Sequence, residues 1–166
     1  MTDAALKPTP NDCDLPRIRA QFSTFAEAID YAAQSQKGLN FHDMRGQLER
    51  VYPYSEMRQD ALKMARRMIA MGINPGDRVA LIAETGPEFA SLFCACVYAG
   101  AWPVPLPLPT SFGGKESFID QLTVQLKSSD PVILIYPEEI GEMAAAAAAR
   151  QGCAGESWHD FVTRGA

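Results

Sequence analysis

The sequence lacks the long apolar run that a membrane-spanning helix requires. No apolar stretch approaches the roughly 20 residues that such a helix needs, so we expect no transmembrane segment. Histidine is scarce as well, and neither His42 nor His159 lies in a motif that would make it a catalytic base. No GxGxxG fingerprint for a dinucleotide occurs. These absences argue against a catalytic site built on a histidine base and against a dinucleotide-binding site.

Cysteine and positive charge are also limited. The 4 cysteines form no recognisable disulfide framework, and the spacing of Cys94 and Cys96 on a predicted helix makes a poor metal pair. A net charge of −5 argues against nonspecific binding to nucleic acid or to an anionic membrane. The N-terminus has no basic segment followed by an apolar one, so we expect no secretory signal. The lack of a disulfide framework predicts a location in the reducing cytoplasm.

What is present is typical of a globular protein of one domain. The 166 residues are 47% apolar and 21% charged. Residues 1–20 are predicted to form a flexible tail, because prolines are scattered there among polar residues. Residues 21–166 alternate between strand and helix patterns, which predicts an α/β fold.

The clearest local pattern runs from Asn74 to Gly100. Asn-Pro-Gly-Asp at 74–77 predicts a type II turn, and the continuous apolar run at 78–83 predicts a strand covered on both faces. Thr85 is expected to cap the next helix, over 87–99. Apolar residues surround most of that helix, so we expect it to be buried on nearly all sides.

Proline then occupies alternate positions of the chain, at Pro103, Pro105, Pro107 and Pro109. In an extended segment these residues remove the N–H donors from one side, which predicts an edge strand or a polyproline-like segment. A proline-stiffened surface linker is the alternative. The interleaved Val104, Leu106 and Leu108 argue against it, because a solvated linker has no need of apolar side chains.

Simpler patterns predict the other elements. They are a helix opened by a capping box at 24–27, a hairpin of strands 39–43 and 47–52, helices over 55–71, 117–128 and 138–150, and a strand at 132–136. The apolar face of the 55–71 helix is predicted to be Met57, Ala61, Met64, Ala65 and Met68. The residues after 154 read as weakly helical.

The Phe-Gly-Gly-Lys sequence at 112–115 invites comparison with a phosphate-binding P-loop. That motif requires a glycine where Pro109 stands and a serine or threonine where Glu116 stands, so we reject it. Two interpretations remain open: a loop beside a ligand, or a segment that needs backbone freedom at the start of a helix.

Several motifs together resemble the AMP-forming acyl ligases. Tyr54-Ser55-Glu56-Met57 resembles their Tyr-x-Glu-Leu, and residues 72–79 resemble their Gly-Val-x-Pro-Gly-Asp-Arg-Val. Residues 98–104 resemble Ala-Gly-Ala-x-Pro-Val, and the Pro-Leu-Pro-Leu-Pro-Thr run is most similar to the fatty acyl-AMP ligase and acyl-CoA synthetase branch. The resemblance covers about residues 22–137.

The resemblance implies an incomplete piece of that family's large N-terminal domain, a small and mostly parallel sheet flanked by helices. We expect residues 21–166 to be this partial AMP-binding domain and to stop before the phosphate-binding loop. Members of the family use ATP and magnesium to convert a fatty acid to its acyl adenylate. They then pass the acyl group to coenzyme A or to an acyl carrier protein.

No catalytic, cofactor-binding or metal-binding residue of that family has a counterpart in this sequence. The resemblance therefore implies that the chain alone is inactive, binds no cofactor and associates with the remainder of the enzyme. Two alternatives stay open: a short non-catalytic binding protein, and one half of a split enzyme. The candidates for a substrate pocket are Thr110, Ser111, Phe112, Gly113, Gly114 and Lys115.

Overall fold

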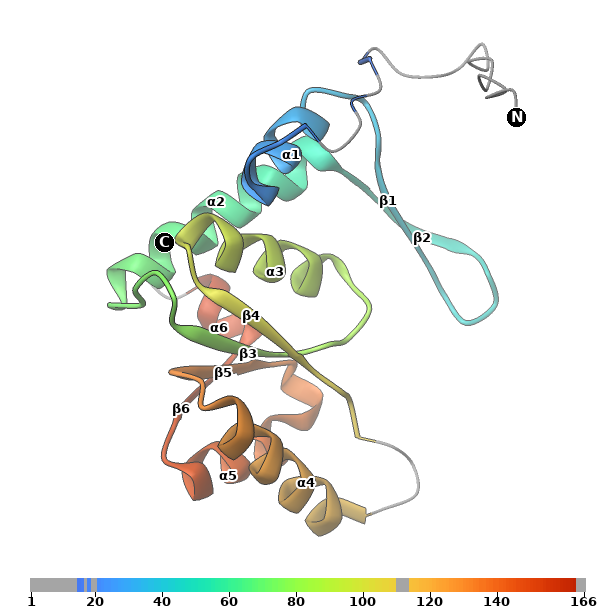
Figure 1. The fold of residues 1–166 in the computed structure, drawn as a ribbon. Helices are drawn as coiled ribbons and strands as arrows, with labels where there is room; N and C mark the ends of the chain where they lie inside the picture. The colour runs from blue at the N-terminus through green and yellow to red at the C-terminus, as the bar shows by residue number, and fades with distance from the viewer. Residues whose placement is uncertain (1–14, 17, 19–20, 110–113, 164–166) are drawn as a thin grey trace, which may run out of the picture.

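A sheet of four parallel strands lies at the centre of the fold (Figure 1). The computed structural model describes residues 15, 16, 18, 21–109 and 114–163, so most of the predicted tail lies outside it. The strand order is β4-β3-β5-β6. Their bounds are Arg78–Ile82 for β3, Trp102–Leu106 for β4, Ile133–Tyr136 for β5 and Ala154–Ser157 for β6.

Helices cover both faces of this sheet. Helices α2 (Tyr54–Ala70), α3 (Pro87–Ala99) and α6 (Trp158–Thr163) share one apolar cluster with Val79 and Leu81 of β3. Helices α4 (Gly114–Ser129) and α5 (Gly141–Gln151) share the other cluster with Ala80 and Ile82. Alternate residues of β3 therefore enter different layers, and this explains why its sequence is apolar without alternation. The predicted α/β class is confirmed.

The N-terminal elements pack beside α2 and α3, and Ile29 of helix α1 (Phe25–Ala32) and Tyr52 of the hairpin belong to the same apolar cluster as these helices. Helix α1 is capped by Thr24, whose hydroxyl accepts a hydrogen bond from the backbone N–H of Glu27 at 3.2 Å, as the capping box predicts. Strands β1 (Gly38–His42) and β2 (Leu48–Pro53) form the expected antiparallel hairpin, which extends away from the body of the molecule in Figure 1. All five predicted core residues of α2 are buried.

The first part of the proline-rich segment forms the edge strand β4, as predicted, and among the described strands it pairs with β3 alone, while Pro107 and Pro109 follow the strand. The turn before β3 is also confirmed. There the N–H of Asp77 donates to the carbonyl of Asn74 at 3.0 Å, and Gly76 has the positive φ of 90° that this turn demands.

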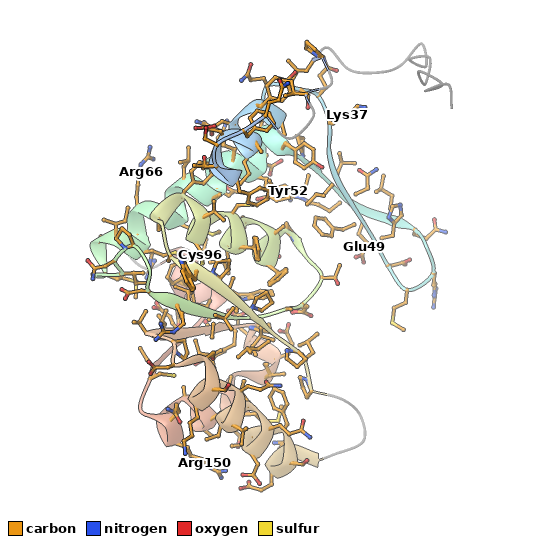
Figure 2. All side chains as sticks on the ribbon, in the orientation of Figure 1. Lys37, Glu49, Tyr52, Arg66, Cys96 and Arg150 are labelled. Carbon is orange, nitrogen blue, oxygen red and sulfur yellow. The ribbon has the colours of Figure 1, made fainter. Side chains whose placement is uncertain are left out.

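Two predictions about α3 need correction. Gly86, not Thr85, is the residue that precedes the helix, and no side chain caps it. The helix is also less enclosed than expected, because Phe89 and Phe93 are only partly buried whereas Leu92 and Cys96 are fully buried. In Figure 2 Cys96 lies inside the molecule, while Glu49 and Arg150 lie at its surface.

The C-terminal part contains a strand that the sequence pattern missed. Residues of β6 have small or polar side chains that favour strands weakly. Tertiary packing selects the strand instead: a Cβ at Gly155 would lie 3.2 Å from the Ala148 side chain and 3.3 Å from the Tyr136 ring, so glycine gives β6 a close fit against α5 and β5. A short 3₁₀ helix, η1 (Glu138–Ile140), also precedes α5.

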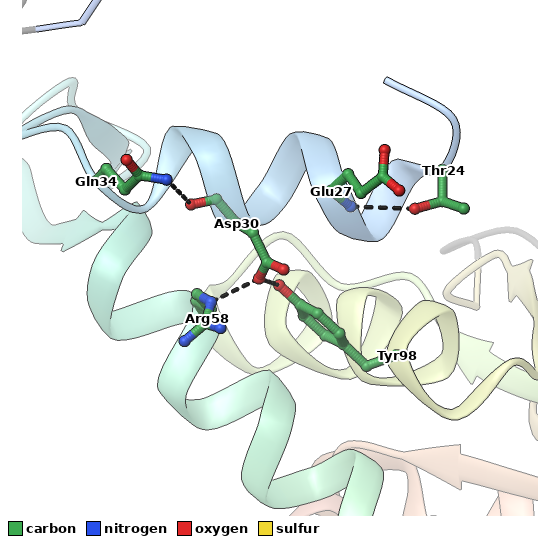
Figure 3. A network of polar contacts seen from close by, with 6 residues as sticks. All are labelled: Thr24, Glu27, Asp30, Gln34, Arg58 and Tyr98. Carbon is green, nitrogen blue, oxygen red and sulfur yellow. Dashed lines mark hydrogen bonds and ion pairs between the residues drawn. The ribbon is translucent and has the colours of Figure 1, made fainter. Parts of the chain in front are cut away.

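A polar contact joins three helices on the outer side of this layer (Figure 3). The Asp30 carboxylate accepts hydrogen bonds from the Tyr98 hydroxyl at 2.6 Å and from Arg58 Nε at 2.6 Å. The Tyr98 hydrogen bond and, after it, the Arg58 hydrogen bond hold the pKa of Asp30 below its ordinary value. The contact fixes α1 against α2 and α3.

Replacing Tyr98 by phenylalanine is expected to lower the free energy of unfolding by about 1 kcal/mol, the usual net contribution of one hydrogen bond. Because folding lowers the pKa of Asp30, its contribution is present above the ordinary value of 3.8 and is lost as the pH falls through the lowered value. Urea unfolding of Tyr98→Phe and of Tyr54→Phe as a control measures this. Equal losses of unfolding free energy in the two variants at pH 7 would contradict a stabilising hydrogen bond from Tyr98 to Asp30.

Candidate functional site: a cleft at the carboxyl ends of the parallel strands

A cleft of about 470 Å³ lies where three of the parallel strands end. Open parallel sheets bind their ligands outside the carboxyl ends of their strands, so this cleft is the candidate site. Its walls come from the connection after β3, from η1 after β5, and from α6 after β6. The lining residues are Glu84, Thr85, Gly86, Pro87, Glu88, Glu138, Glu139, Trp158, His159, Val162 and Thr163.

The cleft is acidic. Four of its lining residues are glutamates. Of the residues that the structure describes, no lysine or arginine lines it. Burial, followed by repulsion from Glu139, Glu88 and Glu138, raises the pKa of Glu84 above its ordinary value. A phosphate or carboxylate placed here would meet the same repulsion.

Glu138 behaves differently from Glu84. Burial opposes its ionisation, but hydrogen bonds outweigh that effect and lower its pKa. The strongest of them comes from the backbone N–H of His159, which donates to Glu138 Oε1 at 2.6 Å. Trp158 beside it is buried, and its indole N–H has no hydrogen-bond partner within the described residues. The indole nitrogen is itself closed off from solvent, so it offers no exposed donor to the cleft.

Replacing Glu84 by glutamine is expected to stabilise the chain at pH 7. Since folding raises the pKa of Glu84, the folded chain retains a proton that the unfolded chain releases as the pH rises above the ordinary value of 4.5. Ionisation of Glu84 therefore destabilises the fold at neutral pH. We expect a gain on the order of 0.5 kcal/mol, because solvent screens these charges.

The gain should disappear as the pH falls below the ordinary range, since Glu84 is then neutral in both the folded and the unfolded chain. Thermal unfolding of wild type and Glu84→Gln between pH 4 and 8 measures the difference. The control is Glu49→Gln, which changes an exposed glutamate of the hairpin. A constant difference across the range would refute the assignment to Glu84.

Of the sequence-predicted pocket residues, the two that the structure describes, Gly114 and Lys115, do not line this cleft. Thr110, Ser111, Phe112 and Gly113 lie outside the described residues. Gly114 and Lys115 begin α4, where Lys115 Nζ lies 3.2 Å from Glu142 Oε2 at the surface. Gly114 has a φ of +67°, which fits the interpretation that the helix start needs backbone freedom. A pocket at 110–115 stays a prediction.

The histidines and cysteines of the described part of the chain form no metal-binding group. No group of three histidine, cysteine, aspartate or glutamate side chains there is placed to hold a metal ion. Burial raises the pKa of Cys94 to about 11 and that of Cys96 to about 12, so both thiols stay protonated at neutral pH. His42 is exposed on the hairpin, and exposed His159 lines the cleft.

Sequence reasoning missed the cleft, although a signal was present. Glu84 follows the predicted strand at 78–83, and Glu138 and Glu139 follow the one at 132–136. Polar residues directly after two parallel strands meet at one edge of the sheet. The wall formed by α6 had no such signal, because β6 was not predicted.

None of the described helices is long and apolar enough to cross a membrane.

Comparison with known proteins identifies the fold. The family described as AMP-binding enzyme matches residues 32–159. A protein of Caulobacter vibrioides named as an acyl-CoA synthetase is 40% identical over 91% of this chain, and a feruloyl-CoA synthase of Amycolatopsis is 32% identical over 58% of it. The chain spans 26% of the first of these relatives and 18% of the second.

Solved structures agree. One from work on fatty acyl-adenylate ligases of E. coli and L. pneumophila is 38% identical, with a TM-score of 0.83 over 88% of this chain and 26% of its own. Another, a fatty acyl-adenylate ligase of L. pneumophila in complex with acyl adenylate and pyrophosphate, has a TM-score of 0.70 at 21% identity over 85% of this chain and 24% of its own, and supports the fold alone. The described fold is thus a partial piece of the adenylate-forming fold, and the chain belongs to the AMP-binding enzyme family.

Proposed function

We propose that this chain is the front part of the catalytic domain of a fatty acid ligase. The complete enzyme would activate a fatty acid with ATP to form acyl adenylate and pyrophosphate, and would pass the acyl group to coenzyme A or an acyl carrier protein. The observation that carries this proposal is the 38% identity and TM-score of 0.83 with a structure from work on fatty acyl-adenylate ligases.

We propose further that the chain supplies structure and not catalysis. Its cleft faces the carboxyl edge where a ligand of a parallel sheet binds, but four glutamates line it without a lysine or arginine from the described residues. Such a lining fits neither a triphosphate nor a fatty acid carboxylate. No group of three or more histidine, cysteine, aspartate or glutamate side chains in the described residues is placed to hold a metal ion, so the proposal leaves magnesium to the remainder of the enzyme.

The missing positive charges would therefore come from the remainder of the enzyme. Exposed apolar side chains on the hairpin support association with such a remainder: Met44, Leu48 and Val51 are all more than half exposed. A location in the cytoplasm belongs to the same proposal, and the free thiols of Cys94, Cys96 and Cys153 fit such a reducing compartment.

A chimera tests the proposal. The matching segment of the Caulobacter acyl-CoA synthetase, 40% identical over 151 residues, is replaced by this chain. Because that segment would carry no catalytic group, we expect the chimera to catalyse ATP–pyrophosphate exchange that depends on fatty acid, while the 166-residue chain alone gives none. The relative without its segment is the negative control.

The outcomes separate the alternatives. A chimera that folds cooperatively yet gives no exchange with any fatty acid would overturn the proposed function. If the separate chain and the remaining segment regain exchange when they are mixed, a split enzyme is supported. Exchange by the 166-residue chain alone would contradict the purely structural role.

A further inference from the structure

We draw no further inference here: the strongest candidate, the glutamate-lined cleft at the carboxyl ends of β3, β5 and β6, belongs to the site already described, and no second observation within the described residues points to a ligand that its acidic cluster would hold.

Discussion

Replacing Glu156 by alanine is expected to lower the free energy of unfolding by about 3 kcal/mol, because it breaks a buried ion pair. Arg67 Nη2 lies 3.2 Å from Glu156 Oε1, and the two side chains are only 16% and 7% exposed. The Arg67 guanidinium also lies 4.9 Å above the centre of the Phe161 ring. Alanine would leave the arginine charge with less compensation inside the layer between α2, β6 and α6.

Chemical unfolding at pH 7 measures the effect, and two variants interpret it. Glu49→Ala changes an exposed glutamate and should stay within about 0.5 kcal/mol of wild type. Arg67→Leu combined with Glu156→Leu removes both charges and should regain most of the loss, since apolar replacements of a buried pair are often neutral. A loss below about 1 kcal/mol for Glu156→Ala would show that water already solvates Arg67.

Replacing Leu134 by alanine should cost about 2–5 kcal/mol, the range for a buried leucine whose removal leaves a cavity. Leu134 lies in the middle of β5, is fully buried, and belongs to the cluster beneath α4 and α5. Strands on both sides hold its backbone in place, so the site has little freedom to collapse.

Two comparisons make the Leu134 result specific. Val124→Ala on α4 removes a side chain that is 67% exposed, so it should have little effect. Leu134→Met nearly conserves volume and should cost less than about 1.5 kcal/mol. If Leu134→Ala and Val124→Ala lose equal stability in urea, the layer beneath α4 and α5 is not packed as the structure has it.

Local signals predicted most of the fold. The turn at 74–77, the capping box at Thr24 and the prolines of β4 each depend on backbone geometry that a few residues determine, and the structure confirms all three. One local signal was wrong, since Gly86 and not Thr85 precedes α3, but the missed strand depends on distant partners. Strand β6 exists because β5 offers it an edge and because Gly155 fits against Tyr136, neither of which is visible in a four-residue segment.

The candidate site was harder to predict for the same reason. Glu84 and Glu138 are separated by more than one helix along the chain, and only the parallel pairing of β3 with β5 brings their connections together. The Phe-Gly-Gly-Lys sequence at 112–115 resembles a phosphate-binding motif in composition alone. Neither Gly114 nor Lys115 reaches the cleft, since α4 lies against the other face of the sheet from α3 and α6.

The prolines of β4 also bear on how such chains would aggregate. Amyloid-like growth requires each added strand to hydrogen-bond along the edge of the last one. Pro103 and Pro105 cannot donate, so the outer edge of β4 is a poor template for a second molecule. At the opposite edge β6 is only four residues long and has the charged Glu156 turned inward. The four-stranded sheet thus resists edge-to-edge polymerisation at both of its edges.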